Sequence, residues 1–226
     1  MPDSTPTTPD TRPTLPSLRA QADRLIELGV HEIAGLPATD LRTFAENAGP
    51  TVNTADGAGA LLTVHPRHAP ASALAPLLRR DDKPGFVVTD MPDVDLFAPL
   101  DGIELPDAPF YLLTGVDRGD RMANWSPDEA LPALTATGRT PLLLSEGVHW
   151  VLQQPAALER NHCFMTIGSR LRKAGGALDA RTPALWISNG TGRDGRERRN
   201  APKLGWCWAG NRHTWLGFAS ATGRRG

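Results

Sequence analysis

Positive charge and tryptophan gather in the same part of this 226-residue sequence. Residues 170–226 carry twelve Lys or Arg and three acidic residues, whereas residues 1–109 carry eight basic and sixteen acidic ones. Four of the six tryptophans lie in the basic stretch: Trp186, Trp206, Trp208 and Trp215. Cations beside flat aromatic side chains suit an anionic ligand with a planar group. The sequence therefore predicts an anion-binding site in its C-terminal part.

A polar, basic and glycine-rich segment, residues 189–202, separates two predicted strands. Guanidinium groups can hold phosphate or carboxylate through two hydrogen bonds, and glycine lets backbone N–H groups approach an anion. The segment lacks the Gly-Lys-Ser/Thr of a phosphate-binding loop, and a solvated loop is the competing interpretation. We assign the charge contacts of the ligand to Arg193, Arg196, Arg198, Arg199 and Lys203.

The segment after this loop alternates tryptophan with other residues. Strand alternation predicts Trp206 and Trp208 on one face and Cys207 on the other. Whichever indole is exposed would stack on the ligand, although tryptophans that simply pack the sheet are the alternative. Residues 210–213 are predicted as a hairpin turn. The side chains expected to read polar edges of the ligand at this turn are Asn211, Arg212 and His213.

A catalytic alternative uses carboxylate, imidazole and thiol groups. Glu146 and His149 lie three residues apart on a predicted helix, where they could form an acid–base couple or a surface hydrogen bond. Cys163 could act as a nucleophile with a histidine, or it could be a buried structural thiol. The catalytic candidates are Glu146, His149, Cys163 and His213, with Arg170 and Arg181 as substrate anchors.

Metal binding is not predicted. His149, His162, Cys163, Cys207 and His213 are ligand types that zinc uses, but no Cys-x-x-Cys or His-x-x-x-His spacing occurs. The acidic residues 90–95 lack the glycine and glutamate of a calcium-binding loop, so a turn is expected there. No cofactor follows from these patterns.

The elements that would position these residues are predicted from periodicity and capping signals. We expect helices at residues 18–28, 39–48 (Thr39 as N-cap), 71–80, 126–136 and from Thr140 to Pro155. We expect strands at residues 61–64, 86–89, 110–116, 163–167, 184–188, 204–209 and 214–219, the last two joined as a hairpin. This order predicts an α+β fold: N-terminal and middle helices packed on a mixed or antiparallel sheet, with a β-rich C-terminal third.

Composition sets the expected boundaries and location. Residues 1–16 contain few apolar side chains that could be buried, and we expect a disordered tail there. We expect residues 17–222 to form one α+β domain, with a possible subdivision near residue 120. Residues 223–226 are expected to be a flexible end. No signal-peptide core or membrane-length apolar run is seen, so we expect a cytoplasmic protein that does not bind membranes.

Several stretches together resemble an uncharacterised actinobacterial family known only as a domain of unknown function. They are YLLTGVDRGD (111–120), NWSPDEA (124–130), GRTP (138–141), CFMTIGSR (163–170), WISNGTGRDG (186–195) and GWCWAGNRHTW (205–215). The resemblance covers roughly residues 15–222. It implies an actinobacterial, cytoplasmic protein forming one continuous unit, and it transfers no catalytic residue, substrate or cofactor.

Three functional hypotheses follow. The first is a protein that binds an anionic small molecule, such as a nucleotide or phosphorylated metabolite, or a nucleic acid. The second is an enzyme acting on a small anionic substrate between the middle helices and the C-terminal sheet. The third is a homo-oligomer in which oppositely charged ends meet. Both ligand-related hypotheses require the arginines near residue 196 and the tryptophan-bearing strand to line one recess.

Overall fold

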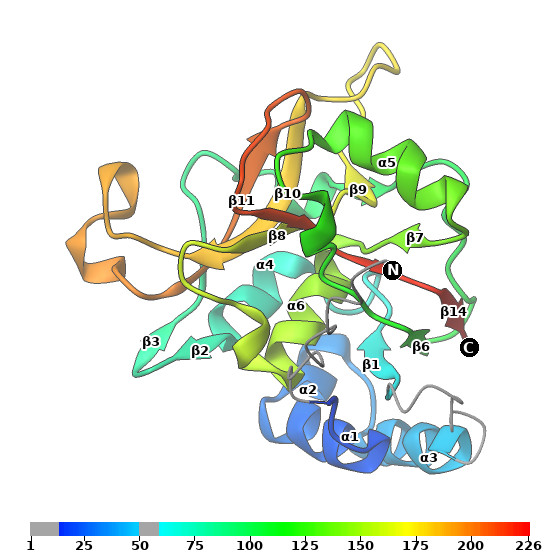
Figure 1. Cartoon of the computed structure of the whole chain (residues 1–226). Coiled ribbons are helices and arrows are strands. Elements are labelled where there is room, and N and C mark those ends of the chain that lie inside the picture. Colours follow the sequence, from blue (N-terminus) through cyan, green and yellow to red (C-terminus); the bar gives the residue numbers. More distant parts are fainter. Residues whose placement is uncertain (1–13, 50–58) are drawn as a thin grey trace, which may run out of the picture.

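Three helices open the part of the chain that the computed structural model describes, residues 14–49 and 59–226 (Figure 1). Most of the predicted tail lies outside these residues. The helices are α1 (Leu18–Glu27), α2 (Val30–Ala34) and α3 (Ala38–Ala48). Ser17 caps α1 by accepting a hydrogen bond from the N–H of Ala20, as its position before the apolar run predicts. The N-cap of α3 is Pro37 rather than the predicted Thr39.

A three-stranded antiparallel sheet joins the beginning and the end of the described chain. Its order is β1-β6-β14, with β1 (Leu61–Val64), β6 (Phe110–Thr114) and β14 (Gly223–Arg225). The first two strands match the predicted ones. The expectation of a flexible end at residues 223–226 is wrong, because β14 pairs with β6 and Arg224 reaches a buried carboxylate.

Short elements fill residues 71–99. They are α4 (Ala71–Leu74), the 3₁₀ helix η2 (Ala75–Leu77), β2 (Arg79–Arg80), β3 (Lys83–Pro84), β4 (Phe86–Val87), η3 (Val94–Leu96) and β5 (Ala98–Pro99). The predicted helix over residues 71–80 stops early because Pro76 has no N–H to continue the helical ladder. β2 and β3 form a small hairpin that stands out from the molecule (Figure 1).

A five-stranded mixed sheet forms the C-terminal part, in the order β12-β8-β10-β11-β4. Its long strands are β10 (Arg181–Ile187) and β11 (Pro202–Trp208); β8 (Cys163–Met165) lies beside β10, β4 lies beside β11, and β12 (Leu216–Phe218) forms the edge beyond β8. The predicted hairpin between β11 and β12 is wrong, because β12 instead runs parallel to β8. The carbonyls of Ala209 and His213 accept hydrogen bonds from Asp128 and Asn124, so the intervening segment crosses the sheet rather than turning back.

The middle helices follow the capping signals only in part. The 3₁₀ helix η4 (Asp120–Met122) leads to α5 (Pro127–Ala136), which begins at the predicted Ser126–Glu129 capping box. Thr140 does not start a helix: β7 (Thr140–Pro141) pairs with β13 (Ser220–Ala221), and α6 (Leu144–Gln153) begins later. The remaining elements are η5 (Pro155–Ala157), β9 (Ser169–Arg170), η6 (Gly192–Asp194) and η7 (Arg196–Arg198).

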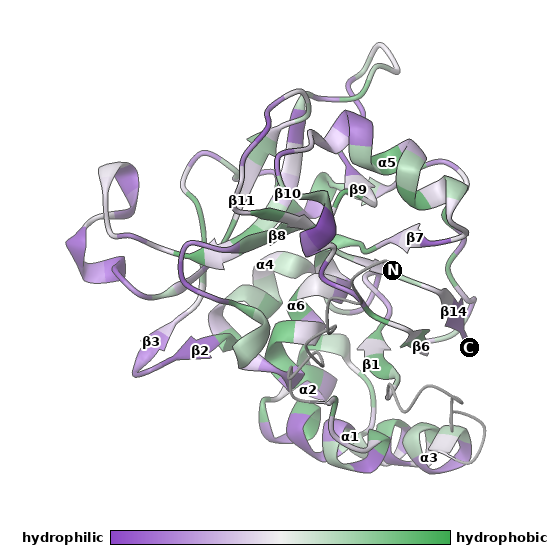
Figure 2. Ribbon diagram, viewed as in Figure 1, coloured by the Kyte–Doolittle hydropathy of each residue, from purple (hydrophilic) through white to green (hydrophobic). Residues whose placement is uncertain are grey.

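Helices pack on both faces of the five-stranded mixed sheet, and the strands concentrate in the C-terminal part, so the predicted α+β class is confirmed. Phe164, Leu185 and Leu204 face the core around α6, every residue of which is buried. Met165, Ala184 and Phe218 lie on the opposite face, where Ala130 and Leu134 of α5 cover them. Apolar residues concentrate in α6 and the central strands (Figure 2). Within the described chain, no helix combines the length and apolar character needed to cross a membrane.

Gly147 lets α6 approach the sheet closely. A Cβ at this position would lie 2.6 Å from Thr166 Cγ2 and 3.1 Å from Leu185 Cδ1. We expect Gly147→Ala to lower the free energy of unfolding by about 1–3 kcal/mol, since overpacking outweighs the better helix propensity of alanine. Urea unfolding measures the change, with Gly175→Ala as the control because a Cβ there meets nothing within 4 Å. Equal stability of the two variants would contradict this packing argument.

Candidate functional site

The sheet face that carries Ala184 becomes a pocket beyond the part covered by α5. Ala184 of β10 and its cross-strand partner Gly205 of β11 are small, so they leave space above the middle of this sheet face. The indole of Trp186 lies over Gly205, where a Cβ would come within 2.5 Å of the ring atom Cη2. The resulting cavity measures about 500 Å³, and we call it the aromatic compartment. Its lining comprises Asn161, His162, Cys163, Ala184, Trp186, Ile187, Asn189, Trp206, Cys207, His213, Trp215 and Leu216.

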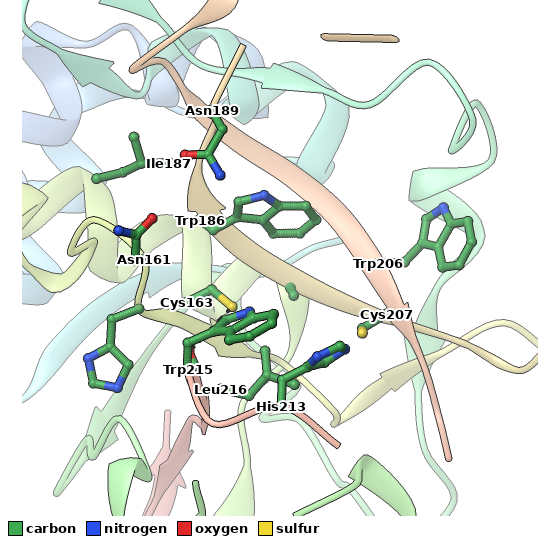
Figure 3. A pocket seen from close by; sticks show the side chains of 12 residues that line it. Asn161, Cys163, Trp186, Ile187, Asn189, Trp206, Cys207, His213, Trp215 and Leu216 are labelled. Atoms are coloured by element: carbon green, nitrogen blue, oxygen red, sulfur yellow. Dashed lines mark hydrogen bonds between the residues drawn. The ribbon is translucent and has the colours of Figure 1, made fainter. Parts of the chain in front are cut away.

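The segment between β11 and β12 supplies one wall of this compartment. His213 and Trp215 stack with their ring centroids 4.7 Å apart. The Cys163 N–H donates to the Trp215 carbonyl at 3.0 Å, which fixes this wall against β8. Figure 3 shows Trp186, Trp215 and His213 gathered around Cys163, whereas Trp206 points to the other side of β11 from Cys207. The wall is therefore a consequence of the crossing that replaces the predicted hairpin.

A second, polar cavity of about 320 Å³ adjoins the first, and we call it the charged compartment. Trp186 and Trp206 line both compartments. The other lining residues are Val88, Thr89, Asp90, Thr191, Arg193, Asp194 and Lys203. Because the two compartments share Trp186 and Trp206 as lining residues, we call them together the recess, with an apolar part and an ionic part.

Both cations of the charged compartment have carboxylate partners and spare hydrogen-bond donors. Lys203 Nζ lies 2.6 Å from Asp194 Oδ2 and 4.5 Å from the centroid of the Trp186 ring. Asp194 is buried and also accepts from Ser188 Oγ at 2.7 Å. Arg193 contacts Asp90 only through Nη1, at 3.4 Å, and its side chain is 76% exposed. The remaining N–H groups of Arg193 are therefore open to an incoming anion, and the largely buried Lys203 lines the same cavity.

The recess contains some of the predicted ligand-binding residues but not all of them. Arg193, Lys203, Trp206 and His213 line it, whereas Arg196, Arg198, Arg199, Trp208, Asn211 and Arg212 do not. Trp208 packs against Trp206 with ring centroids 4.5 Å apart, on one face as the alternation predicts. Arg212 pairs with Glu129, and Asn211 hydrogen-bonds with Cys207.

The predicted catalytic residues lie on opposite sides of the five-stranded sheet. Cys163 and His213 line the aromatic compartment, but Glu146 and His149 belong to α6, which covers the other face. Glu146 accepts hydrogen bonds from Arg224 and from the Tyr111 hydroxyl. Glu146 and His149 are therefore not within reach of a ligand in the recess.

The chemistry of the thiols also disfavours a nucleophilic site. Burial, together with the nearby Cys207, raises the pKa of Cys163 to about 12. Burial raises the pKa of Cys207 as well. Because the thiolate is the nucleophile, both groups are poorly reactive at neutral pH. Arg170 and Arg181 also lie outside the recess lining: Arg170 donates to the Asp179 carbonyl, and Arg181 makes a bidentate pair with Asp93.

A buried arginine that the sequence interpretation missed supports the rim of the aromatic compartment. Arg118 is fully buried and contacts Asp120 at 3.2 Å and Glu159 at 2.9 Å. His162 lies 3.3 Å and 3.2 Å from the same two carboxylates, and its carbonyl accepts from Arg118. This four-residue ring holds the turn before β8. The described residues contain no cluster of three or more His, Cys, Asp or Glu side chains arranged for a metal ion.

His149 makes the stability of the protein dependent on pH. Its Nδ1 lies 2.8 Å from the Ser145 carbonyl and its Nε2 accepts from the Val64 N–H, while burial lowers its pKa from 6.5 to about 4. The unfolded chain therefore binds a proton at a higher pH than the folded one, and stability falls as pH decreases from 6.5 to 4. The expected loss from this group is roughly 3 kcal/mol.

The variant His149→Gln has no titrating group at this position. We expect it to be less stable than the parent at pH 7, because its amide must replace two hydrogen bonds in a packed core. Its free energy of unfolding should change much less between pH 6.5 and pH 4, measured by urea unfolding at several pH values. A parent and variant with the same pH dependence would show that His149 is not the source.

Comparison with known proteins places the chain in a family without assigning an activity. No curated protein and no solved structure matches it. The model of a family of unknown function, DUF5701, matches residues 24–226, which is most of the chain. The resemblance noted from the sequence motifs is confirmed at this level, and the match extends through β14 to the last residue. The chain therefore belongs to the DUF5701 family of unknown function.

Proposed function

We propose that the protein binds a small anionic ligand of the nucleotide class in the two-compartment recess. The observation that carries this proposal is that Trp186 forms a wall of both compartments. A planar ring in the aromatic compartment and a phosphate in the charged compartment would then belong to one molecule. The cytoplasmic location and the actinobacterial origin inferred from the sequence stay predictions.

The aromatic compartment suits the ring of such a ligand. Its volume of about 500 Å³ falls within the range of small-molecule pockets. Trp186 and Trp215 offer flat surfaces, and stacking on an aromatic side chain contributes about 1–3 kcal/mol per base. Asn161 and Asn189 add amide groups that can pair with the polar edge of a base.

The charged compartment suits the anion but is not strongly positive. Two cations and two carboxylates line it, so its formal charge is balanced. Phosphate binding there depends on the free donors of Arg193 and Lys203 and on displacement of Asp90 from Arg193. The exposed Asp90 is the carboxylate that competes with the ligand.

The other two hypotheses have less support. An enzyme using Cys163 would need a thiolate in a site that raises the pKa of that thiol. A homo-oligomer held by opposite charges would need unpaired charges, but many basic residues of the C-terminal part pair within the chain, as Arg181 does with Asp93. We therefore favour ligand binding.

Fluorescence titration with fragments of a nucleotide tests the proposed function. The probes are the four common nucleoside monophosphates, the corresponding nucleosides and ribose 5-phosphate. We expect at least one monophosphate to quench tryptophan emission and to bind at least about tenfold more tightly than either of its fragments, because each compartment contributes separately. The proposal fails if no monophosphate binds at concentrations up to about 1 mM.

The Trp186→Ala variant tests whether the recess is the place of binding. Loss of the shared wall should weaken monophosphate binding about tenfold or more, in line with the stacking energy of one base. Trp125→Ala is the matched control, since this exposed indole lies outside the lining of both compartments. Equal affinity of the two variants would place the ligand elsewhere.

The Asp90→Asn variant tests the ionic part of the site and, unlike Trp186→Ala, is expected to strengthen binding. Removing the carboxylate that pairs with Arg193 should strengthen monophosphate binding about fivefold, the effect of an exposed ion pair of about 1 kcal/mol. Nucleoside binding should not change. Asp101→Asn, which removes the partner of exposed Arg172 outside the recess, is the control. Weaker monophosphate binding by Asp90→Asn would contradict the assignment of the phosphate to this compartment.

A further inference from the structure

Folding neutralises much of the positive charge of residues 170–226. Five of its arginines pair with carboxylates from earlier in the sequence. The pairs are Arg172–Asp101, Arg181–Asp93, Arg193–Asp90, Arg212–Glu129 and Arg224–Glu146. Apart from Arg193, which also lines the charged compartment, these cations serve the fold, so the excess charge of the sequence does not by itself indicate a ligand.

Several cations of the described chain lack such partners, and four of them lie close together. Among the described residues, no carboxylate pairs with Lys83, Arg196, Arg198 or Arg199, which we call the cationic ridge. Arg198 lies over the Phe86 ring at 4.5 Å, and Lys83 Nζ donates to the Glu197 carbonyl at 2.8 Å. The ridge thus joins the β2–β3 hairpin to the loop between β10 and β11, two hydrophilic projections on the same side of the molecule (Figure 2).

The ridge is anchored and adjoins the recess. Asp194 ties the base of the loop to Ser188 through a buried hydrogen bond and to Lys203 through a partly buried one. Phe86, beneath Arg198, is the cross-strand neighbour of Lys203 in the charged compartment. Arg193 lines that compartment from the same loop. A chain of phosphates leaving the compartment would therefore meet the ridge next.

We propose that the cationic ridge binds the phosphate backbone of a single-stranded nucleic acid whose terminal nucleotide occupies the recess. This inference rests on the proposed function and makes the ligand a polymer rather than a free nucleotide. Guanidinium groups match phosphate oxygens bidentately, and three of the four ridge cations are arginines. A single strand is required because a base can enter the aromatic compartment only when it is unpaired.

Fluorescence anisotropy with a labelled oligodeoxynucleotide of about ten residues tests the inference. If three phosphates meet the ridge, the logarithm of the association constant should fall with the logarithm of salt concentration with a slope of about −2. The double variant Arg196→Ala/Arg199→Ala should weaken oligonucleotide binding about tenfold and reduce the slope to about −1. Its affinity for the monophosphate should not change, because neither side chain lines the recess.

Controls separate this inference from general attraction between charges. Arg67→Ala/Arg172→Ala removes the same charge from two exposed arginines outside the ridge and recess, and it should leave oligonucleotide affinity unchanged within about twofold. Polyglutamate and a duplex of the same length should each compete at least about tenfold less well than the single strand. Equal competition by either of them, or equal weakening by both double variants, would overturn the inference.

The outcomes also distinguish this inference from the proposed function. One outcome is that a monophosphate binds, whereas the oligonucleotide binds no more tightly and its affinity does not depend on salt. This outcome would contradict the polymer inference and leave the proposed nucleotide site supported. Absence of binding by both probes would remove the two proposals together. Oligonucleotide binding that depends on the ridge but not on Trp186 would overturn the placement of the terminal nucleotide in the recess.

Discussion

The buried ion pair between Glu146 and Arg224 is the interaction on which the arrangement of the sheets depends. The carboxylate is fully buried and receives Arg224 Nε at 2.6 Å and Nη2 at 2.8 Å, together with the Tyr111 hydroxyl and the Leu143 N–H. Arg224 also donates to Thr140 Oγ1 and the Pro141 carbonyl. One cluster thereby joins α6, β6, β7 and β14. Removing one charge from such a pair leaves the other buried and uncompensated, at a cost of about 3–5 kcal/mol.

The shape of the recess depends on this arrangement of the helices and sheets. α6, fixed by Glu146, supports one face of the five-stranded sheet through Gly147, and α5 covers part of the other face. What remains open is the area beside Ala184, where Trp186 lies over Gly205, which has no side chain. The parallel pairing of β12 with β8 then brings Trp215 over Cys163. A hairpin would have paired β12 with β11 and left that area without its aromatic wall.

Local signals predicted the fold best, and long-range pairing limited the rest. The caps at Ser17 and Ser126 depend on residues within three positions, and both helices begin where these residues indicate. Thr140 does not begin a helix as its sequence context predicts, because its conformation is set by pairing with Ala221, about eighty residues away. Long-range pairing also explains why only part of the candidate site could be predicted from the sequence. Arg193 and Lys203 were identified from composition, but Trp186 as the shared wall depends on the register that sets it opposite Lys203. No local pattern encodes that register.

The distribution of charge along the sequence does not show which cations remain unpaired in the folded chain. A basic stretch and an acidic stretch in one chain can attract a ligand, a second copy or each other, and the sequence does not distinguish these cases. In the described chain, five carboxylates from earlier in the sequence form ion pairs with five arginines of the basic stretch. Among the cations that folding leaves without a counter-charge, Arg196, Arg198 and Arg199 all lie on one anchored loop beside the recess. Their position, rather than the total charge, is what argues for an anionic partner.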